Sequence, residues 1–306
     1  METKSFLNTD DSFDSHNIHF IVGTGRCGTT ILARILNNHS EVVVPHELQI
    51  LFEISNNGKR LYEFFDEGTA QQWDAEEFIK HISRMCPHDF QKYFDYKSFF
   101  TNYTYPVVSL AKMVSDMYHE IARSRHKRIF LEQTPWYGLR LDIIKSIFPQ
   151  AKIIHILRDG RDVALSFSKT PWWHDDPEEN LERWSQEITT ISNDLQTLFS
   201  SDKYIEVRYE DLVNDPANVL KDICVFLDIE FEETMLNPQS LIDYSLYKKR
   251  KDGESISSNE YEKWENEKEK ITFSDNVYGW KKSAVFSCLS EEVRSSLNRY
   301  QYDTNP

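Results

Sequence analysis

The chain has 306 residues, of which 40% are hydrophobic and 28% charged, an ordinary balance for a globular protein of one large α/β domain or two small ones. Its 35 basic and 50 acidic side chains leave a formal net charge of −15, which disfavours general binding to nucleic acid or to anionic membranes, because both need a positive surface. An anionic ligand must therefore be held by a local cluster of Arg, Lys and backbone N–H groups.

The sequence predicts a cytoplasmic protein with free thiols and no metal site. The four cysteines are scattered and form no Cys-x-x-Cys pair, so free thiols are expected (Cys27, Cys86, Cys224 and Cys288). The ten histidines show no paired spacing of the kind that binds zinc. Residues 1–16 are polar, are expected to form a flexible tail, and lack the basic start and apolar core of a secretory signal. No apolar run approaches the roughly 18 residues of a membrane helix, so we expect a cytoplasmic protein without membrane insertion.

The first strong pattern is a strand, a glycine-rich turn and a helix. His19–Val22 is a short β-branched and aromatic run that ends at Gly23. After the turn, Ile31–Leu36 is apolar at helical spacing. A second short strand is predicted at Glu41–Val44 and stops at Pro45.

Residues 49–125 are predicted to form a mainly helical insertion, with helices at Ala75–Met85 and Val107–Arg123. Strands and helices alternate after it. Further strands are predicted at Lys127–Leu131, Ala151–Leu157 and Lys203–Tyr209. Helices are predicted at Leu139–Phe148, from Val163–Phe167 onward, at Glu178–Phe199 and at Ala217–Leu227. The alternation predicts an α/β fold with a mostly parallel sheet covered on both faces, in one domain over residues 17–306. Residues 248–270 are nearly free of aliphatic side chains and are predicted to be mobile.

The turn after the first strand has the Gly-x-x-x-x-Gly frame of a phosphate-binding loop, in Gly23-Thr-Gly-Arg-Cys-Gly28. Glycines let the backbone curl around an anion, and the N–H groups at Gly28–Thr30 would face it with the helix dipole. Thr29 stands where a nucleotide kinase or ATPase has its lysine, and the positive charge is instead Arg26. A group shorter and less charged than a triphosphate is therefore favoured. There are two alternatives to an anion-binding loop: a tight turn that binds nothing, and a loop that presents Cys27 as a nucleophile.

A second cluster follows the central predicted strand, where Leu157 is succeeded by Arg158-Asp-Gly-Arg-Asp162 and, eight residues after Arg158, by Ser166. The carboxyl end of a strand that opens into a helix is where α/β sheets bind ligands. Arg offers a planar fork of donors to a phosphate, and Ser adds a hydroxyl. The alternative is a salt-bridge network at the helix start, pairing Arg158 with Asp162 or Arg161 with Asp159.

Two anion sites at the carboxyl ends of two parallel strands describe a ligand with phosphates at both ends, and adenosine 3′,5′-bisphosphate would match. At this point the sequence resembles the sulfotransferases that use 3′-phosphoadenosine 5′-phosphosulfate (PAPS), most of all the branch of protein-tyrosine sulfotransferases and their bacterial relatives. Five segments carry the resemblance, in the family's order: Gly25-Arg-Cys-Gly-Thr-Thr30, Asn38-His-Ser-Glu-Val-Val-Val, Phe148-Pro-Gln-Ala-Lys-Ile-Ile, Arg158 through Ser166, and Arg208-Tyr-Glu-Asp-Leu-Val-Asn-Asp-Pro. The similarity covers residues 19–227 and runs less clearly to Trp280.

The resemblance implies a three-layer P-loop-type fold and an in-line transfer of a sulfuryl group from PAPS, without a metal. It assigns the loop residues Gly25, Arg26, Cys27, Gly28, Thr29 and Thr30 to the 5′-phosphosulfate, and Arg158 and Ser166 to the 3′-phosphate. Arg26 would also stabilise charge in the transition state. Glu47 occupies the position of the general-base glutamate of the tyrosine-sulfating branch, and His46 is the rival base, because other branches use histidine.

Some positions depart from the family or match it loosely. Gln133, in Glu132-Gln-Thr-Pro135, stands where the family often has a lysine that stabilises the transition state. Tyr278-Gly-Trp-Lys-Lys282 resembles the segment that closes over the nucleotide, which suggests Lys281 as a phosphate contact. Tyr209 would lie near the adenosine or in the core, and Trp172-Trp173 would line an acceptor pocket or simply pack.

The acceptor stays open among carbohydrate, lipid, small molecule and peptidyl tyrosine. Two other functions also stay open: a P-loop kinase for a small molecule, and a non-catalytic nucleotide-binding module.

Overall fold

The computed structural model describes residues 17–45, 47–48, 50, 72–74, 95–101, 107–170, 173, 175–236, 277–283 and 285–304. The expected tail 1–16, the expected helix Ala75–Met85 and the segment 248–270 lie outside these residues. None of the described helices is long and apolar enough to cross a membrane.

The centre of the molecule is a five-stranded sheet in which every neighbouring pair is parallel, in the order β2-β5-β1-β6-β7. The strands are β1 (Ile18–Val22), β2 (Val42–Val43), β5 (Ile129–Gln133), β6 (Ile153–Leu157) and β7 (Tyr204–Arg208). From β1 the chain continues to β2 on one side of the sheet, and from β6 it continues to β7 on the other. The carboxyl ends of β1 and β6 therefore lie at the point where connections diverge, which is where such sheets bind ligands.

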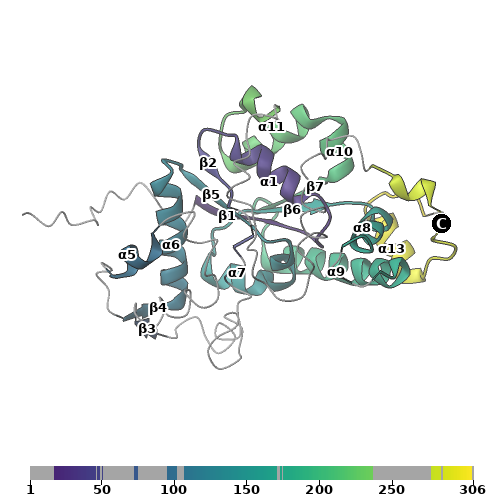
Figure 1. Ribbon diagram of the computed structural model, residues 1–306, viewed down its shortest axis with the longest axis horizontal. Coiled ribbons are helices and arrows are strands. Elements are labelled where there is room, and N and C mark those ends of the chain that lie inside the picture. The colour runs from purple at the N-terminus through teal and green to yellow at the C-terminus, as the bar shows by residue number, and fades with distance from the viewer. Residues whose placement is uncertain are drawn as a thin grey trace, which may run out of the picture.

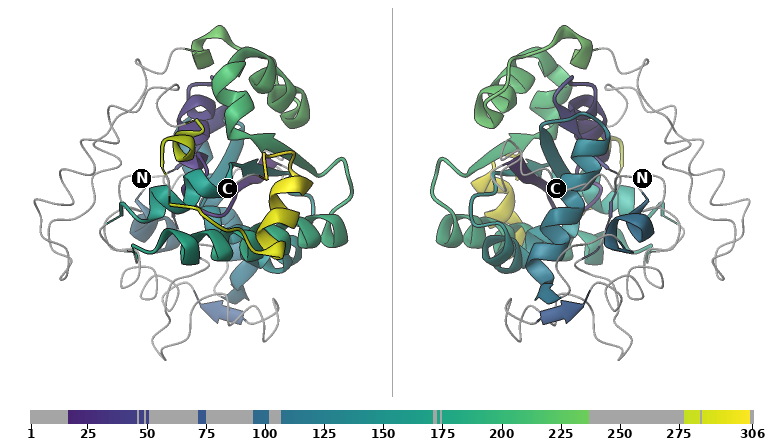
Figure 2. Two further views of the ribbon diagram at one scale, coloured as in Figure 1. Left: turned by 90° about the vertical axis from the view of Figure 1, so that its right-hand side faces the viewer. Right: turned by 90° about the vertical axis from the view of Figure 1, so that its left-hand side faces the viewer.

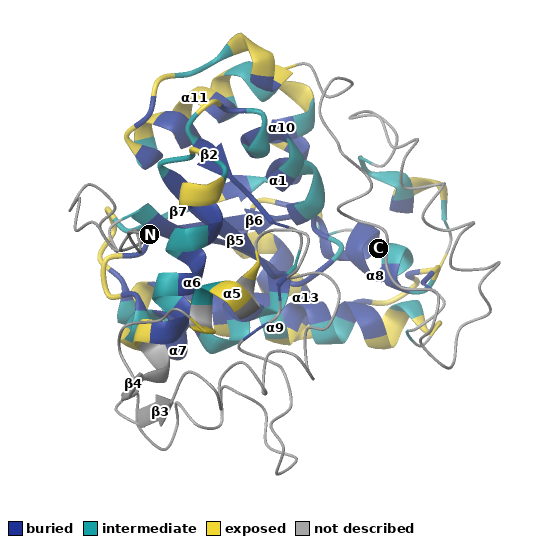
Figure 3. Cartoon of the chain, turned by 60° about the vertical axis from the view of Figure 1, so that its left-hand side comes forward, coloured by how far each residue is buried: buried dark blue, intermediate teal, exposed yellow. Residues whose placement is uncertain are grey.

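Helices cover both faces of this sheet (Figure 1), which confirms the predicted α/β architecture. One face carries α1 (Thr29–Asn37), α10 (Tyr209–Asn214) and α11 (Pro216–Leu227), and the other carries α6 (Leu110–Ser124), α7 (Leu141–Ile147) and α9 (Pro177–Leu198). Alternate strand residues point to opposite faces, so Phe20 and Val22 join one apolar core and Ile21 joins the other. Strands β1, β2, β5 and β6 are buried throughout and the edge strand β7 only in part, while the outer sides of α9 and α11 are exposed (Figure 3).

Several element boundaries differ from the predicted ones. The helix expected at Val107–Arg123 begins at Leu110, because Val107–Ser109 forms a strand, β4, that pairs antiparallel with β3 (Gln72–Asp74). The short helix α5 (Tyr96–Thr101) precedes this strand. A 3-10 turn, η3 (Pro135–Arg140), precedes α7. Helix α8 (Gly160–Phe167) begins three residues earlier than expected, because Asp159 caps it by accepting a hydrogen bond from the backbone N–H of Arg161.

The C-terminal segment returns to the body of the protein. Helix α13 (Glu291–Arg299) packs along α9, as both views of Figure 2 show, and the hydroxyls of Ser185 and Ser296 lie 2.8 Å apart between them. Two short 3-10 elements, η4 (Glu233–Leu236) and η7 (Gly279–Lys282), flank the undescribed residues 237–276. Trp280 in η7 donates its backbone N–H to Asp162 in α8 at 2.8 Å.

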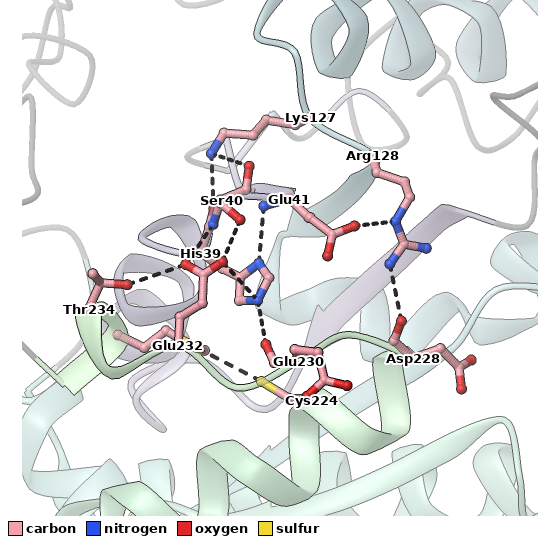
Figure 4. A network of polar contacts seen from close by, with 11 residues as sticks. His39, Ser40, Glu41, Lys127, Arg128, Cys224, Asp228, Glu230, Glu232 and Thr234 are labelled. Atoms are coloured by element: carbon pink, nitrogen blue, oxygen red, sulfur yellow. Dashed lines mark hydrogen bonds and ion pairs between the residues drawn. The ribbon is translucent and has the colours of Figure 1, made fainter.

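A polar network lies at the end of the sheet where the strands begin (Figure 4). Lys127 donates from Nζ to the carbonyls of His39 and Ser40, each at 2.9 Å, at the end of α1. Nδ1 of His39 accepts the Glu41 N–H, so Nε2 carries the hydrogen that it donates to the Glu230 carbonyl at 2.7 Å. This network links α1 to the segment after α11. It lies at the amino ends of the strands, whereas the candidate site lies at their carboxyl ends.

Candidate active site

The glycine-rich loop between β1 and α1 adopts a backbone that needs glycine at two positions. Gly25 has φ 75° and Gly28 has φ 104°. A Cβ on Gly28 would lie 2.4 Å from Cδ2 of Tyr209, and a Cβ on Gly25 would lie 3.0 Å from Cζ of Phe167. Arg26 also has a positive φ, of 52°, and the loop therefore turns sharply at the end of β1.

Helix α1 begins with N–H groups that no side chain caps. Gly28 is its N-cap residue, and its first turn contains no acidic residue. Side chains cap four other helices instead, namely α8, α9, α11 and α13 (Asp159, Asp176, Asp215 and Ser290). The N–H groups at Thr29 and Thr30 therefore combine with the helix dipole to favour an anion at this position.

Arg26 links the loop to the second predicted cluster. Its Nε donates a hydrogen bond to Oγ of Ser166 in α8 at 3.0 Å, and its own carbonyl accepts one from Nη1 of Arg158 at 3.0 Å. Burial lowers the pKa of Arg26 to about 10, with a contribution from the charge of Arg158, while the Glu47 carboxylate opposes the shift. The guanidinium remains charged at neutral pH, so two arginines face one small region.

The two arginines of the Arg158–Asp162 segment have different surroundings. Arg161 is fully buried and makes two bonds to Asp159, at 3.0 and 2.8 Å, and one to the carbonyl of Asp303 at 2.6 Å. Its guanidinium also lies 3.4 Å from the centre of the Trp280 ring. Arg158 lies 4.8 Å from the Tyr209 ring centre and 3.9 Å from Asp162. Both expected salt bridges therefore exist. Arg161 is a structural residue, and Arg158 borders the loop.

The carboxylate of Glu47 follows β2 and lies near two groups of the site. It acts electrostatically on Arg26, whose charge it favours, and on Glu132 at the end of β5, whose charge it disfavours. Leu48, the next residue, donates its N–H to Oε1 of Glu132 at 3.2 Å. The rival base His46 lies outside the described residues.

Cys27 is not set up as a nucleophile. It is buried, and burial raises the pKa of its thiol to about 11, so it stays protonated at neutral pH. A Cβ on Gly23 would lie 2.5 Å from its sulfur, which shows how tightly the thiol fills the loop. Cys27, Cys224 and Cys288 are free thiols, and Cys86 lies outside the described residues.

Aromatic side chains line one side of the loop. The Trp173 ring centre lies 5.8 Å from that of Trp136 and 5.3 Å from that of Phe167, which contacts Gly25. Nε1 of Trp173 donates to Asn180 at 2.8 Å. Packing therefore accounts for Trp173, while Trp172 lies outside the described residues. The indole N–H of Trp136 is buried beside Gly25 without a hydrogen-bond partner among the residues that the structure describes.

Three other predicted positions have clear surroundings. Gln133 is buried at the carboxyl end of β5, and within the described part of the chain its amide nitrogen has no hydrogen-bond partner. Tyr209 is buried against Gly28 and Arg158. Lys281 is exposed, and its ammonium lies 5.1 Å from the Tyr278 ring centre and 5.6 Å from that of Trp280. Its contact with a phosphate stays a prediction.

Comparison with known proteins shows which family this chain resembles. A model of the sulfotransferase family matches residues 19–233. Protein-tyrosine sulfotransferase A of Caenorhabditis elegans is 23% identical over 309 residues, covering 98% of this chain and 71% of that protein. Nodulation protein NoeE of Sinorhizobium fredii is 25% identical over 154 residues, covering 50% of this chain. The matches span 31% of NoeE and 59% of a putative protein-tyrosine sulfotransferase of C. elegans, less than two thirds of either protein.

Solved structures agree in fold. The sulfotransferase domain of the curacin biosynthetic pathway superposes with a TM-score of 0.60 at 22% identity, covering 94% of this chain and 97% of that one. The sulfotransferase domain of the Synechococcus PCC 7002 olefin synthase gives a TM-score of 0.58 at 24% identity, covering 94% and 95%. Since the family model spans most of the chain, including both segments that are predicted to bind anions, the chain belongs to the sulfotransferase family.

Proposed function

We propose that the protein transfers a sulfuryl group from PAPS to a hydroxyl acceptor, with Glu47 as the general base. The observation that carries the proposal is the position of Arg26, which bonds to Ser166 and to Arg158 and so joins the two anion-binding segments into one site. A donor with a phosphosulfate at one end and a 3′-phosphate at the other requires such a double site.

The proposed reaction is an in-line displacement. The acceptor oxygen forms a bond to sulfur while the bond from sulfur to the 5′-phosphate oxygen breaks. Adenosine 3′,5′-bisphosphate leaves, and the acceptor proton passes to the Glu47 carboxylate. The N–H groups at the start of α1 and the Arg26 guanidinium stabilise the negative charge on the sulfonate and on the leaving oxygen.

The other residues hold the donor in place. Arg158 and Ser166 bind the 3′-phosphate, Arg158 through a charged fork that packs on the Tyr209 ring. Gly25 and Gly28 allow the backbone to approach the 5′ end. The Glu47 carboxylate is close enough to Arg26 to favour its charge, as is expected of a base that reaches an acceptor aligned behind the sulfur.

The names of several relatives refer to acceptors with a hydroxyl group, and for this reason we favour a hydroxyl acceptor over an amine. Four are named as protein-tyrosine sulfotransferases, two of them putative, and tyrosine is a phenol. Two are named as sulfotransferases of omega-hydroxy-beta-dihydromenaquinone-9, an alcohol, and each of these matches covers 40% of this chain. A carboxylate base suits both acceptors, because each must lose a hydroxyl proton as it attacks.

Thermal unfolding with nucleotides tests the donor. Adenosine 3′,5′-bisphosphate should stabilise the protein, by about 2.7 kcal/mol at a hundredfold excess over Kd, whereas 5′-AMP, ADP and ATP should stabilise it much less. The variant Arg158→Ala should lose most of this stabilisation. Lys112→Ala, which removes a charge from an exposed ion pair on α6, should keep it. A larger stabilisation by Mg²⁺-ATP would contradict the proposal and favour a kinase.

Transfer of radiolabelled sulfate from PAPS to a panel of phenols and alcohols tests the chemistry. Glu47→Gln should bind adenosine 3′,5′-bisphosphate as tightly as the wild type does, yet lose at least about 100-fold in rate. A Glu47→Gln variant with an unchanged rate would rule out Glu47 as the base, and His46 would be tested next.

A further inference from the structure

Glu132 is a carboxyl group enclosed in the protein directly beside the proposed active site. It is the fourth residue of β5, its exposed fraction is 0%, and it lies at the carboxyl end of a strand adjacent to β1. Strand β2, which leads to Glu47, pairs with the other edge of β5. Glu132 thus lies between the glycine-rich loop and the segment that carries the proposed base.

The two oxygens of Glu132 have different surroundings. Oε1 accepts the backbone N–H of Leu48 at 3.2 Å and the hydroxyl of Thr134 at 2.8 Å. Oε2 is buried and has no hydrogen-bond partner among the residues that the structure describes. A buried carboxylate with one unsatisfied oxygen is unfavourable, whereas the acid form carries its charge-neutralising proton on Oε2 and keeps both bonds to Oε1.

The charges around Glu132 favour the same form. Burial raises its pKa from an ordinary 4.5 to about 8, with a contribution from the nearby Glu47 carboxylate, while the hydrogen bonds from Thr134 and Leu48 oppose the shift. Glu47 also acts on a cation, since its charge favours the charged form of Arg26 in the loop after β1. At neutral pH Glu132 is therefore a carboxylic acid.

We propose that Glu132 is a positioning residue for sulfuryl transfer: as a neutral acid it ties the Leu48 backbone, and with it Glu47, to the end of β5 without adding a second negative charge. The inference rests on the proposed function, since Glu47 matters only if it is the base. When Glu132 ionises, two carboxylates repel each other across this contact, and the geometry that places Glu47 beside Arg26 is lost.

The test is the dependence of kcat/KM on pH between 6 and 10 in the wild type, Glu132→Gln and Glu132→Ala. Glutamine has the shape of the protonated acid, keeps an acceptor for Leu48 and Thr134, and cannot ionise. The wild type should lose about tenfold in kcat/KM for each pH unit above about 8, whereas Glu132→Gln should match it at pH 7 within about twofold and stay level to about pH 9. Glu132→Ala should lose about 10- to 100-fold at pH 7 while its stabilisation by adenosine 3′,5′-bisphosphate is unchanged.

A second measurement is independent of transfer. Because the folded state holds a proton on Glu132 that the unfolded state releases above pH 4.5, the urea midpoint of the wild type should fall relative to that of Glu132→Gln as pH rises from about 4.5 to about 8. A constant difference between the two midpoints would mean that Glu132 is already ionised, and would overturn the proposal.

Two further results would overturn the proposal. One is an equal decrease of kcat/KM above pH 8 in the wild type and in Glu132→Gln, and the other is a kcat/KM in Glu132→Ala equal to that of the wild type. A protein that transfers no sulfuryl group, or a fully active Glu47→Gln, would instead contradict the proposed function. In that case Glu132 has no positioning role in sulfuryl transfer, and the comparison of urea midpoints shows only whether Glu132 is protonated.

Discussion

Nε of Arg26 lies 3.0 Å from Oγ of Ser166, although 140 residues of chain separate the two. The contact exists because β1 and β6 are neighbours and parallel, so that the loop after one strand and the helix after the other begin at the same edge. The Ser166 hydroxyl therefore orients the Arg26 guanidinium and bridges the two segments that we propose to bind the donor.

The variant Ser166→Ala should therefore bind adenosine 3′,5′-bisphosphate about tenfold more weakly, because a hydrogen bond to a charged group contributes roughly 1.5 kcal/mol. Isothermal titration calorimetry measures the change. Ser168→Ala is the matched control, since that hydroxyl bonds to the Ala164 carbonyl at 3.0 Å and should leave the affinity unchanged. Equal losses in both variants would indicate general disturbance of α8 instead of a role for Ser166.

Gly28→Ala should disrupt the loop. The new Cβ would lie 2.4 Å from the Tyr209 ring at a φ of 104°, so the buried ring and the backbone must both move. We expect a loss of about 2–4 kcal/mol in the free energy of unfolding, together with loss of nucleotide binding. Gly279→Ala provides the control, because its Cβ would meet Asp162 at an ordinary 3.5 Å. Urea unfolding compares the two, and similar stabilities would contradict the packing described for Gly28.

Arg161→Ala should be far more destabilising than Arg158→Ala. Removing Arg161 leaves the Asp159 carboxylate fully buried without its two bonds, and we expect a cost of about 3–5 kcal/mol. The control is Arg123→Ala, which breaks an ion pair with Glu120 on the exposed side of α6 and should cost less than about 0.5 kcal/mol. Chemical denaturation of the three variants separates the structural arginine from the one proposed to bind a phosphate.

These two arginines also show how far the sequence allows prediction. That both follow the carboxyl end of a parallel strand could be predicted from local patterns, namely an apolar strand followed by a helix in an alternating α/β chain. Which of them is fully enclosed follows from Trp280 and Asp303, which pack on Arg161 from more than a hundred residues further along the chain. No local pattern contains that contact.

Glu132 and Val107–Ser109 were beyond local prediction for the same reason. The raised pKa of Glu132 comes mainly from its burial, with a contribution from the Glu47 charge, and Glu47 follows a strand, β2, that pairs with β5. Val107–Ser109 continues an apolar pattern that also fits a helix, and its pairing with Gln72–Asp74 determines that it is a strand. The family motifs, in contrast, are contiguous segments and could be recognised from the sequence.

Alkylation should distinguish the free thiols. At pH 8, iodoacetamide should modify the exposed Cys288 and leave the buried Cys27 and Cys224 unmodified in the folded protein, because the pKa of each buried thiol is raised to about 11. Peptide mass spectrometry reads the result. Rapid modification of Cys27, or a Cys27→Ala variant that folds and binds nucleotide but transfers no sulfuryl group, would contradict its assignment as a packing residue.

His19, at the start of β1, should make the protein sensitive to acid. Burial, with smaller effects from Lys152 and Lys203, lowers its pKa from 6.5 to about 3, and its Nδ1 accepts the Lys152 N–H at 3.2 Å. The folded state therefore keeps His19 neutral, so its contribution to stability is complete above pH 6.5 and is lost as pH falls toward 3. At pH 4.5 the loss should be about 2–3 kcal/mol. His19→Asn, whose Oδ1 can replace Nδ1 as the acceptor, should show a correspondingly smaller decrease in urea midpoint between pH 7.5 and 4.5, and an equal decrease would exclude His19 as the acid-sensitive group.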